Sequence, residues 1–337
     1  LTLGYQRINV SGFDFSVSEQ ATRFEANRSP LLDANTQPNC YGSYNWDGAR
    51  LVTVAKLSRP FTNAYGYFTP KVQVVSRSYQ FDAPLASNGQ TTASVTVPTM
   101  SLDTGVVFER NQLAFGRGWT QTFEPRLYYV YTPFQNQNYL PNYDSGYNTY
   151  NFASIFTENT FGGYDRISDS KMLTVGASSR FIDPDSGAEG ARFTLAQRIR
   201  MQAERVVINP VTDVAPTAGL NDILAGASVN LTRAASVESL VDYNPKTNNY
   251  QRSMVGTRYS PGSYRVVTAA YRSQNNDDGT PYSRQTDLGW QWPLHDMWGG
   301  QDEGLGEGRG LGEGRWYSVA RLNYSGLDHK FVQSVIG

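Results

Sequence analysis

Cysteine and histidine are scarce in this sequence. Its 337 residues include one cysteine, Cys40, and two histidines, His295 and His329, which lie far apart and fit no metal-ligand spacing. A single cysteine cannot form an internal disulfide, so we expect an inert thiol at Cys40. We also expect no metal site and no bound cofactor.

Long apolar runs and an excess of either charge are also missing. No stretch of about 18 apolar residues occurs, and the mean hydropathy is −0.48, which excludes a bundle of membrane-spanning helices. Lysine and arginine number 29 against 30 aspartates and glutamates, a balance that argues against a nucleic-acid-binding protein. The chain begins at Leu1 without a signal peptide and ends at Gly337 within an expected strand. We therefore expect a piece of a longer exported protein.

Motifs of the common enzyme classes are absent as well. There is no G-x-S-x-G, no H-E-x-x-H and no Cys-His cluster. The acidic pairs Asp183/Asp185 and Asp277/Asp278 lie in expected turns, where solvation explains them better than acid–base catalysis. Segment Gly304–Arg315 repeats Gly-Leu-Gly-Glu-Gly-Arg twice, but its glycines cannot satisfy a dinucleotide-binding G-x-G-x-x-G. We interpret it as a flexible turn insertion, and we predict no catalytic residue and no enzyme activity.

Alternation of apolar and polar residues is the strongest positive signal. In Thr286–Leu294 one parity carries Leu288, Trp290, Trp292 and Leu294, and the other carries Asp287, Gly289, Gln291 and Pro293. A β-strand directs successive side chains to opposite faces, so this segment has one bulky apolar face and one polar or small face. Similar alternation recurs in Trp119–Tyr131, Leu173–Phe181, Arg192–Glu204 and Ile223–Thr232. Many such strands without intervening helices predict an antiparallel barrel wall with lipid outside and water inside.

About sixteen strands are expected from these patterns and from the turn signals between them. They are expected near residues 2–10, 15–26, 41–47, 49–59, 65–81, 95–110, 118–132, 171–181, 191–204, 222–233, 236–243, 251–259, 263–273, 285–294, 315–324 and 329–337. Long links such as Pro133–Ser170 and Arg205–Asn221 alternate with tight ones such as Ala234–Ala235. Outer-membrane barrels have long external loops and short periplasmic turns. The alternation of long and short links therefore predicts that Pro133–Ser170 is an external loop.

One region carries a more specific signal than alternation. Its motifs are Phe108–Asn111, Gly118–Phe134, Tyr143–Ser145, Phe161–Asp169 and Leu173–Phe181. Together they resemble the C-terminal barrel region of the LptD family, the LPS-assembly proteins of Gram-negative outer membranes. The motifs span about Phe108 to Phe181, and outside them the resemblance rests on barrel pattern and strand order.

The resemblance implies a fold, a location and partners. It implies an all-β transmembrane antiparallel barrel in the cell outer membrane, with residues 1–337 forming an incomplete segment of about 14–16 strands. Family members take lipopolysaccharide from a periplasmic Lpt bridge, and a barrel plugged by the lipoprotein LptE passes it to the outer leaflet. Ser334–Gly337 resembles the strand before the family's paired-cysteine motif. We therefore expect this chain to lack the N-terminal jelly roll, the terminal seam strands and those cysteines, and to supply wall, lumen and loops.

Parity assigns candidate residues to the lumen and to the lipid face. The lumen candidates are Glu124, Arg126, Arg192, Arg198 and Arg200. Glu124 and Arg126 would either brace neighbouring strands through ion pairs or meet LptE or saccharide. The arginines suit phosphate, which lipopolysaccharide carries, although inward arginines are common in barrel lumens. The lipid-facing or girdle candidates are Trp119, Trp290 and Trp292.

The long external loop supplies the candidates for contact with a plug. They are Tyr143, Asp144, Asp165, Arg166 and Asp169. The loop is rich in Tyr, Phe and Asn, which favours packing over disorder, and loops of this length are usually functional or disordered. We expect it to fold over or into the barrel mouth and to help hold LptE. Solvated charge is the alternative interpretation of Asp165, Arg166 and Asp169.

Three other functions compete with the LPS-transport interpretation. A passive porin or TonB-type receptor barrel would share the alternation but has no reason to carry the Phe108–Phe181 motifs. A soluble β-sandwich or adhesin would cover its apolar parity with a second sheet. An outer-membrane protease or lipase would need a catalytic constellation that the sequence lacks.

Overall fold

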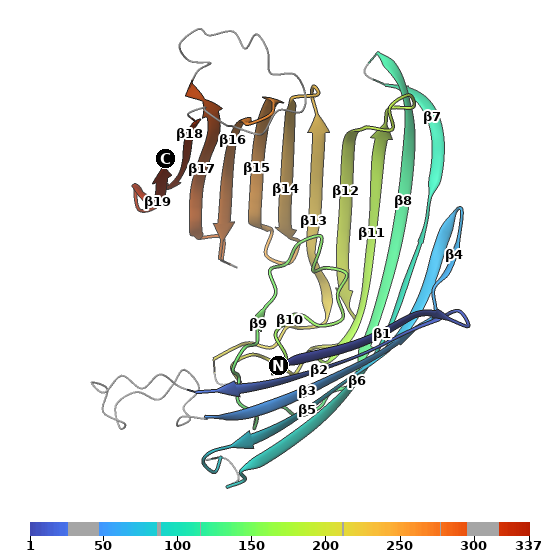
Figure 1. The fold of residues 1–337 in the computed structure, drawn as a ribbon, viewed down its shortest axis with the longest axis vertical. Coiled ribbons are helices and arrows are strands. Elements are labelled where there is room, and N and C mark those ends of the chain that lie inside the picture. The colour runs from blue at the N-terminus through green and yellow to red at the C-terminus, as the bar shows by residue number, and fades with distance from the viewer. Residues whose placement is uncertain (26–46, 86–88, 115, 211, 277, 295–316) are drawn as a thin grey trace. The chain divides into compact units, whose positions relative to one another are not determined.

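The computed structural model describes residues 1–25, 47–85, 89–114, 116–210, 212–276, 278–294 and 317–337 (Figure 1). Cys40, His295, the strand expected near 41–47 and the Gly304–Arg315 repeat lie mostly or wholly outside these residues. Within the described ranges, no helix is long and apolar enough to span a bilayer. The expected all-β class is confirmed, because the described elements form one large sheet and a small two-stranded one.

The described strands follow one another through the whole chain. Their bounds are β1 Thr2–Val10, β2 Phe13–Phe24, β3 Gly48–Ser58, β4 Phe61–Asn63, β5 Gly66–Phe81, β6 Thr92–Val106, β7 Phe108–Ala114, β8 Arg117–Thr132, β9 Gly146–Tyr147, β10 Phe161–Gly162, β11 Ser170–Ile182, β12 Glu189–Arg200, β13 Gly219–Asn230, β14 Ala235–Asn244, β15 Asn249–Gly262, β16 Arg265–Asn275, β17 Pro281–Pro293, β18 Tyr317–Ser325 and β19 Lys330–Ile336. Most expected strands match these bounds within a few residues.

One expected strand is divided, and three short ones were not expected. The strand expected over 95–110 ends at Val106, and β7 begins at Phe108. At the interruption, the Val107 N–H donates to the Tyr65 carbonyl at 2.7 Å, next to the Gly66–Val106 pair of the β5–β6 ladder. Strands β4, β9 and β10 have only two or three residues, too few to show a period of two.

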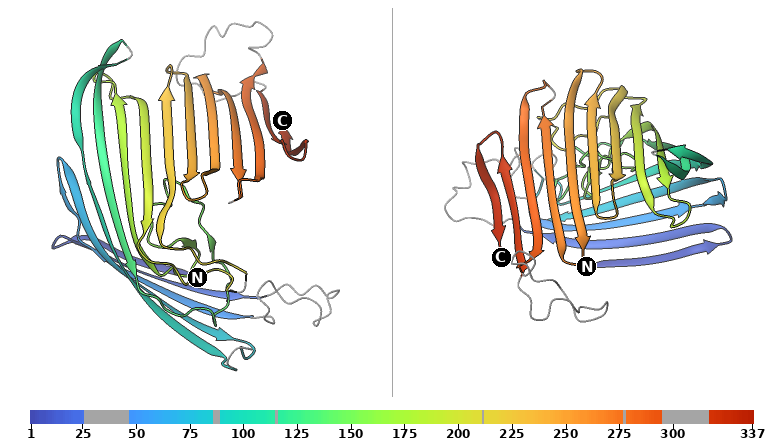
Figure 2. Two further views of the ribbon diagram at one scale, coloured as in Figure 1. Left: turned by 180° about the vertical axis from the view of Figure 1, so that it is seen from behind. Right: turned by 90° about the horizontal axis from the view of Figure 1, so that it is seen from above.

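The chain forms two compact units, and the strands β8, β11, β12 and β13 each contribute residues to both. Unit 1 contains Leu1–Val107, Pro125–Val175 and Gln197–Asn221, and unit 2 contains Phe108–Glu124, Gly176–Ala196 and Asp222–Gly337. In unit 1, β1, β2, β3, β5 and β6 pair antiparallel in that order, and β6 pairs with β8. In unit 2, β13 to β19 form an antiparallel meander in chain order (Figure 2).

Unit 1 has one covered face and one exposed apolar face. The covered face carries Val52, Val54, Val75, Val95 and Val97, which pack with loop residues in one hydrophobic cluster. The opposite parity exposes large apolar side chains, among them Leu51, Leu57, Phe68, Val72 and Met100. Contiguous exposed apolar surface of this kind is typical of a protein that meets lipid or a partner.

Unit 2 shows the same division between its faces. Leu288 lies beside Ala269 and Leu322 in the strand register, whereas its neighbour Asp287 lies beside Ala270 and Asn323 on the other face. Asp287 is buried and Leu288 is exposed. The apolar face also carries a stacked Tyr259–Trp292 pair, with ring centroids 6.5 Å apart. The alternation expected for Thr286–Leu294 is therefore present.

Candidate functional site

The segment between β8 and β11, residues 133–169, is hereafter the β8–β11 loop. It folds onto the covered face of unit 1 and brings Leu140 and Ile167 into the hydrophobic cluster with Val52 and Val75. The ring of Tyr143 stacks on Phe24 of β2 at 4.0 Å between centroids. Burial of these apolar groups stabilises the docked loop, at about 25 cal/mol for each Å² removed from water.

Arg50 of β3 is the main electrostatic anchor of this loop. Its guanidinium contacts both oxygens of Asp144, at 2.8 and 2.6 Å, and one oxygen of Asp165, at 2.7 Å. The side chains of Arg50 and Asp165 are 1% and 0% exposed, so this charge is withdrawn from water. A buried cation of this kind is tolerated only when it is paired and hydrogen-bonded, which the two carboxylates achieve.

Asp165 uses both of its oxygens to fix the loop. One oxygen accepts hydrogen bonds from Arg50 and from the Tyr79 hydroxyl at 2.9 Å. The other accepts the backbone N–H groups of Tyr143 at 2.6 Å and Asp144 at 2.8 Å. The carboxylate thus joins two strands to a distant part of the loop, as expected for a residue that orders it.

Arg77 of β5 also holds this segment, but its hydrogen-bond acceptors are carbonyl oxygens rather than a carboxylate. Its guanidinium donates to the backbone carbonyls of Tyr164 at 2.9 Å and Asp165 at 2.6 Å, and to the Gln137 side-chain carbonyl at 2.8 Å. Gln137 in turn donates to the Ile167 carbonyl at 2.8 Å. Arg77 is fully buried, so these acceptors replace its lost hydration.

Arg166 and Asp169 stabilise the loop from within and tie it to the next long link. Arg166 donates to the carbonyls of Leu140 at 2.9 Å and Pro141 at 3.0 Å. Asp169 accepts the N–H groups of Arg205 at 2.7 Å and Val206 at 2.9 Å. The structure therefore joins Tyr143, Asp144, Asp165 and Arg166 by hydrogen bonds, while Asp169 binds the next long link. Asp165, Arg166 and Asp169 are buried rather than solvated.

The Asp144 carboxyl titrates well below its usual range. Burial works to raise its pKa, but the Arg50 guanidinium and the Tyr164 N–H outweigh burial and lower the pKa from 3.8 to about 2. A lowered pKa means that the contact stabilises the fold above pH 3.8 and is lost as the pH falls toward 2. The Asp144 carboxylate that faces Arg50 is therefore charged at neutral pH.

A second group of contacts holds the middle of the loop. Glu158 forms an ion pair with Lys71 of β5 and accepts a hydrogen bond from Ser101 at 3.1 Å. Arg198 of β12 is buried and donates to the carbonyls of Ser154 at 2.9 Å and Ile155 at 2.6 Å. Arg198 was predicted to point into the lumen, and the structure places it under the loop.

The other predicted lumen residues form ion pairs. Arg126 pairs with Asp103 of β6 at 2.6 Å, and Glu124 pairs with Arg180 of β11 at 2.9 Å. Both arrangements correspond to the bracing of neighbouring strands. The last two, Arg192 and Arg200, pair with Glu189 at 2.7 Å and Glu204 at 2.8 Å, respectively.

Trp119 is less exposed than Trp290 and Trp292. The residue is 6% exposed, and its ring meets Phe181 edge-on with the ring centroids 6.4 Å apart. The ring covers Gly190, where an added Cβ would lie 2.2 Å from the indole. Trp119 therefore packs against its own unit, and a girdle role remains a prediction for the other two tryptophans.

Gly190→Ala should reduce stability, since no space exists for a methyl group beneath the Trp119 ring. We expect the free energy of unfolding to fall by about 1–3 kcal/mol, the usual cost of overpacking. Urea unfolding of the refolded full-length protein measures the change. Gly118→Ala is the control, because nothing lies within 4 Å of its added Cβ. Equal stability of the two variants would contradict the packing argument.

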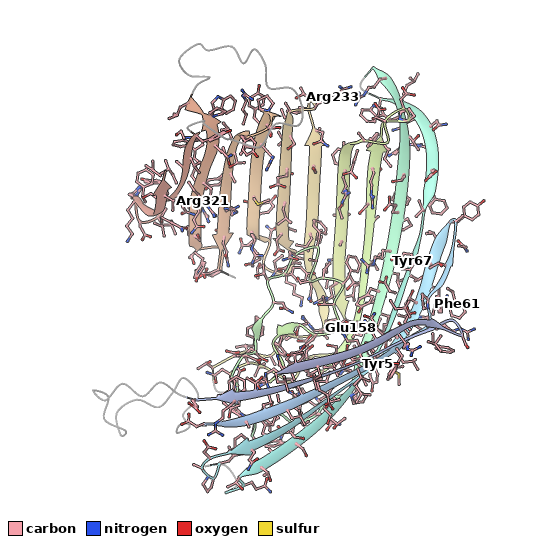
Figure 3. All side chains as sticks on the ribbon, viewed as in Figure 1. Tyr5, Phe61, Tyr67, Glu158, Arg233 and Arg321 are labelled. Carbon is pink, nitrogen blue, oxygen red and sulfur yellow. The ribbon has the colours of Figure 1, made fainter. Side chains whose placement is uncertain are left out.

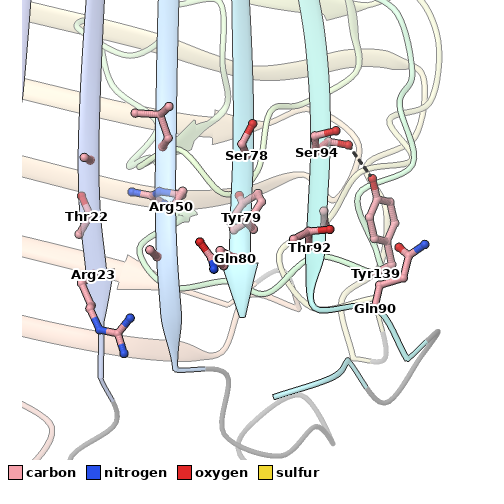
Figure 4. A pocket seen from close by; sticks show the side chains of 14 residues that line it. Thr22, Arg23, Arg50, Ser78, Tyr79, Gln80, Gln90, Thr92, Ser94 and Tyr139 are labelled. Atoms are coloured by element: carbon pink, nitrogen blue, oxygen red, sulfur yellow. Dashed lines mark hydrogen bonds between the residues drawn. The ribbon is translucent and has the colours of Figure 1, made fainter. Parts of the chain in front are cut away.

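A hollow of about 1010 Å³ lies at the ends of β2, β3, β5 and β6 (Figure 4). Its lining includes Ala21, Leu51, Ser78 and Ser94, and Tyr139 of the β8–β11 loop reaches it from the side. The Tyr139 hydroxyl donates to the Ser94 carbonyl at 3.2 Å. Because β6 pairs with β8 only over Met100–Gly105, this hydroxyl satisfies an edge carbonyl that β8 does not reach.

The described residues hold no group of three or more His, Cys, Asp or Glu able to bind a metal ion.

Comparison with known proteins places the chain in a family. A family model described as "LptD: LPS transport system D" matches residues 1–298. The chain belongs to the LptD family. The all-β fold of the described residues agrees with the β-barrel fold of the LptD family.

Several relatives bear the name "LPS-assembly protein LptD". The chain is 49% identical over 337 residues to that of Albidiferax ferrireducens, 48% identical over 345 residues to that of Polaromonas sp., and 35% identical over 341 residues to that of Burkholderia pseudomallei. Each alignment covers all of this chain but only 39–40% of the LptD relative. The chain therefore spans about two fifths of the length of these LptD proteins.

A solved structure titled "Structure of the FpvAI-pyocin S2 complex" resembles the chain weakly. The TM-score is 0.34 at 14% identity, with 98% of this chain and 51% of the other covered. The LptD assignment rests on the sequence match, and the absence of enzyme activity stays a prediction.

Proposed function

We propose that this chain supplies wall, lumen face and loops of an outer-membrane barrel that inserts lipopolysaccharide into the outer leaflet. The family match over residues 1–298 carries this proposal, since it covers most of the chain. The exposed apolar parity, with Leu51, Val72 and Leu288, supports a lipid-facing wall. These observations favour the LPS-transport function over a passive porin or a TonB-type receptor. The exposed apolar face also argues against a soluble β-sandwich, because a second sheet would cover that face in a sandwich.

Depletion of the full-length protein in its own cells tests this function. Newly made lipopolysaccharide should then stop reaching the cell surface and accumulate inside, as measured by surface labelling after a metabolic pulse. Complementation with the wild-type gene should restore surface delivery. Normal delivery during depletion, with small-solute uptake reduced instead, would support the passive pore.

We further propose that the docked β8–β11 loop supports an LptE-type plug. Arg50, Arg77 and Asp165 hold the loop on the covered face of the wall, so its remaining surface is presented in a fixed geometry. A preorganised loop binds a partner without the entropy cost of ordering at that moment. Periplasmic delivery of the lipid through a separate domain belongs to the same proposal.

Leu288→Arg should weaken the wall far more than a change on the opposite face. A lipid-facing arginine costs about 2–4 kcal/mol near the bilayer midplane and less near an interface. The matched variant is Gln291→Arg, which lies on the polar face three residues away. Unfolding of the full-length protein from lipid vesicles measures both. Equal losses from the two substitutions would show that the faces do not differ in environment.

A further inference from the structure

A row of four residues crosses the polar face of unit 2. The strand register pairs Arg258 of β15 with Thr268 of β16, Thr268 with Gly289 of β17, and Gly289 with Arg321 of β18. Directly paired residues point to the same face. The row therefore places two arginines on either side of a small threonine–glycine floor. Figure 3 labels Arg321 on β18.

The row lines a hollow of about 590 Å³, whose lining includes all four residues. Glycines keep this space open. A Cβ on Gly289 would lie 2.8 Å from the Thr268 hydroxyl, and a Cβ on Gly256 would lie 3.1 Å from the Glu238 carboxylate. A larger side chain at Gly289 would fill the floor between the two arginines, and one at Gly256 would fill the adjacent row of the hollow.

Two acidic side chains, Glu238 and Asp287, also line the hollow, and neither forms an ion pair with these arginines. Asp287 forms an ion pair with Arg272 and accepts a hydrogen bond from Asn323 at 2.7 Å. Glu238 lies over Gly256, in the adjacent row. Among the residues that the structure describes, no carboxylate forms an ion pair with Arg258 or Arg321, and both arginines are exposed. Two exposed arginines without an ion pair in the described part of the chain thus line one hollow.

We propose that the Arg258–Arg321 row is a binding subsite for a phosphate group on a glycolipid. Three strand spacings separate the two arginine backbones by roughly 14 Å, which two long side chains can bridge around one anion. Guanidinium groups match phosphate by paired N–H donors. The Thr268 hydroxyl donates to the Gly289 carbonyl at 3.3 Å, so the two arginines supply the donors for the anion. The subsite rests on the proposed lipopolysaccharide function and adds to it the phosphate-binding residues.

The test compares phosphorylated and dephosphorylated lipid A as ligands. The full-length protein, purified in detergent with its co-isolated partners, is titrated with each lipid, and inorganic phosphate serves as a separate competitor. Wild-type protein should bind the phosphorylated form about tenfold more tightly, as expected for one or two charge-assisted hydrogen bonds. Arg258→Ala/Arg321→Ala should abolish this preference, leaving affinity for the dephosphorylated form unchanged. Arg258→Lys/Arg321→Lys should retain part of it.

Arg233→Ala is the matched control. Arg233 is also exposed, has no ion pair within the described part of the chain, and lies in the turn between β13 and β14, outside the hollow (Figure 3). It should keep the full preference, and heat-modifiable migration on gels shows that each variant is folded. A preference unchanged in the double variant would overturn the subsite alone, as would inorganic phosphate competing as well as the lipid. Binding of neither lipid by wild-type protein would overturn the proposed function as well.

Discussion

Arg50→Met should detach the β8–β11 loop from the wall and lower the free energy of unfolding by about 3–5 kcal/mol, the cost of breaking a buried ion pair. Methionine fills a similar volume but leaves Asp165 and Asp144 without their cation. Asp165 has no exposed surface, so water cannot replace the lost partner. Limited proteolysis within the loop of the full-length protein should accelerate together with this loss. Urea unfolding measures the energetic change.

Arg23→Met provides the control for Arg50→Met. Arg23 pairs with Glu25 and Asp82 on the surface, and its side chain is 55% exposed. Surface ion pairs contribute at most about 1 kcal/mol, so stability and loop proteolysis should barely change. Adding Asp165→Asn to Arg50→Met should cost less than the sum of the single effects, because the two residues interact directly. If Arg50→Met behaved like Arg23→Met, the anchor would have no energetic role.

Deleting Asn142–Asp169 should weaken LptE retention and sensitise cells to large hydrophobic antibiotics, with the wall still inserted. The deletion removes both carboxylates that Arg50 binds and the two backbone carbonyls that Arg77 binds, so the main anchors of the docked loop are lost. Co-purification of LptE and antibiotic inhibition zones measure the outcome in cells that express the full-length protein. Replacing Asp183–Ala188, the turn between β11 and β12, with a Gly-Ser segment of equal length should leave both at wild-type levels. If the deletion also left LptE co-purification and antibiotic inhibition at wild-type levels, the loop would have no role in LptE retention.

Alternation predicted the faces well because the period of two follows from strand geometry alone. Asp287 and Leu288 lie on opposite faces as expected, and Arg126 lies where it can brace a neighbouring strand. Local pattern sufficed for these residues, since each depends on neighbours along the chain. For Asp165, Arg166 and Asp169 the sequence left both loop-ordering contacts and solvated charge open, and the structure buries all three.

The partners of the loop could not be predicted in the same way. Arg50 meets Asp165 across 115 positions and Arg77 meets Gln137 across 60, and alternation assigns a face without naming a partner. A signal was nevertheless present. Arg50 and Arg77 occupy the parity of Val52 and Val75, so a charge interrupts a row of buried valines. An arginine in such a row needs acceptors from elsewhere in the fold.

The long sequence separation between Arg50 and Asp165 also bears on the order of folding. A contact across 115 positions closes a large loop of chain, and such contacts form slowly because their entropy cost precedes their stabilisation. The anchor requires β3, β5 and the complete β8–β11 loop in place together. Loop docking therefore belongs to a late step of assembly, after the intervening strands have paired, and a chain arrested earlier would present a bare row of buried valines and two unpaired arginines to quality-control proteases.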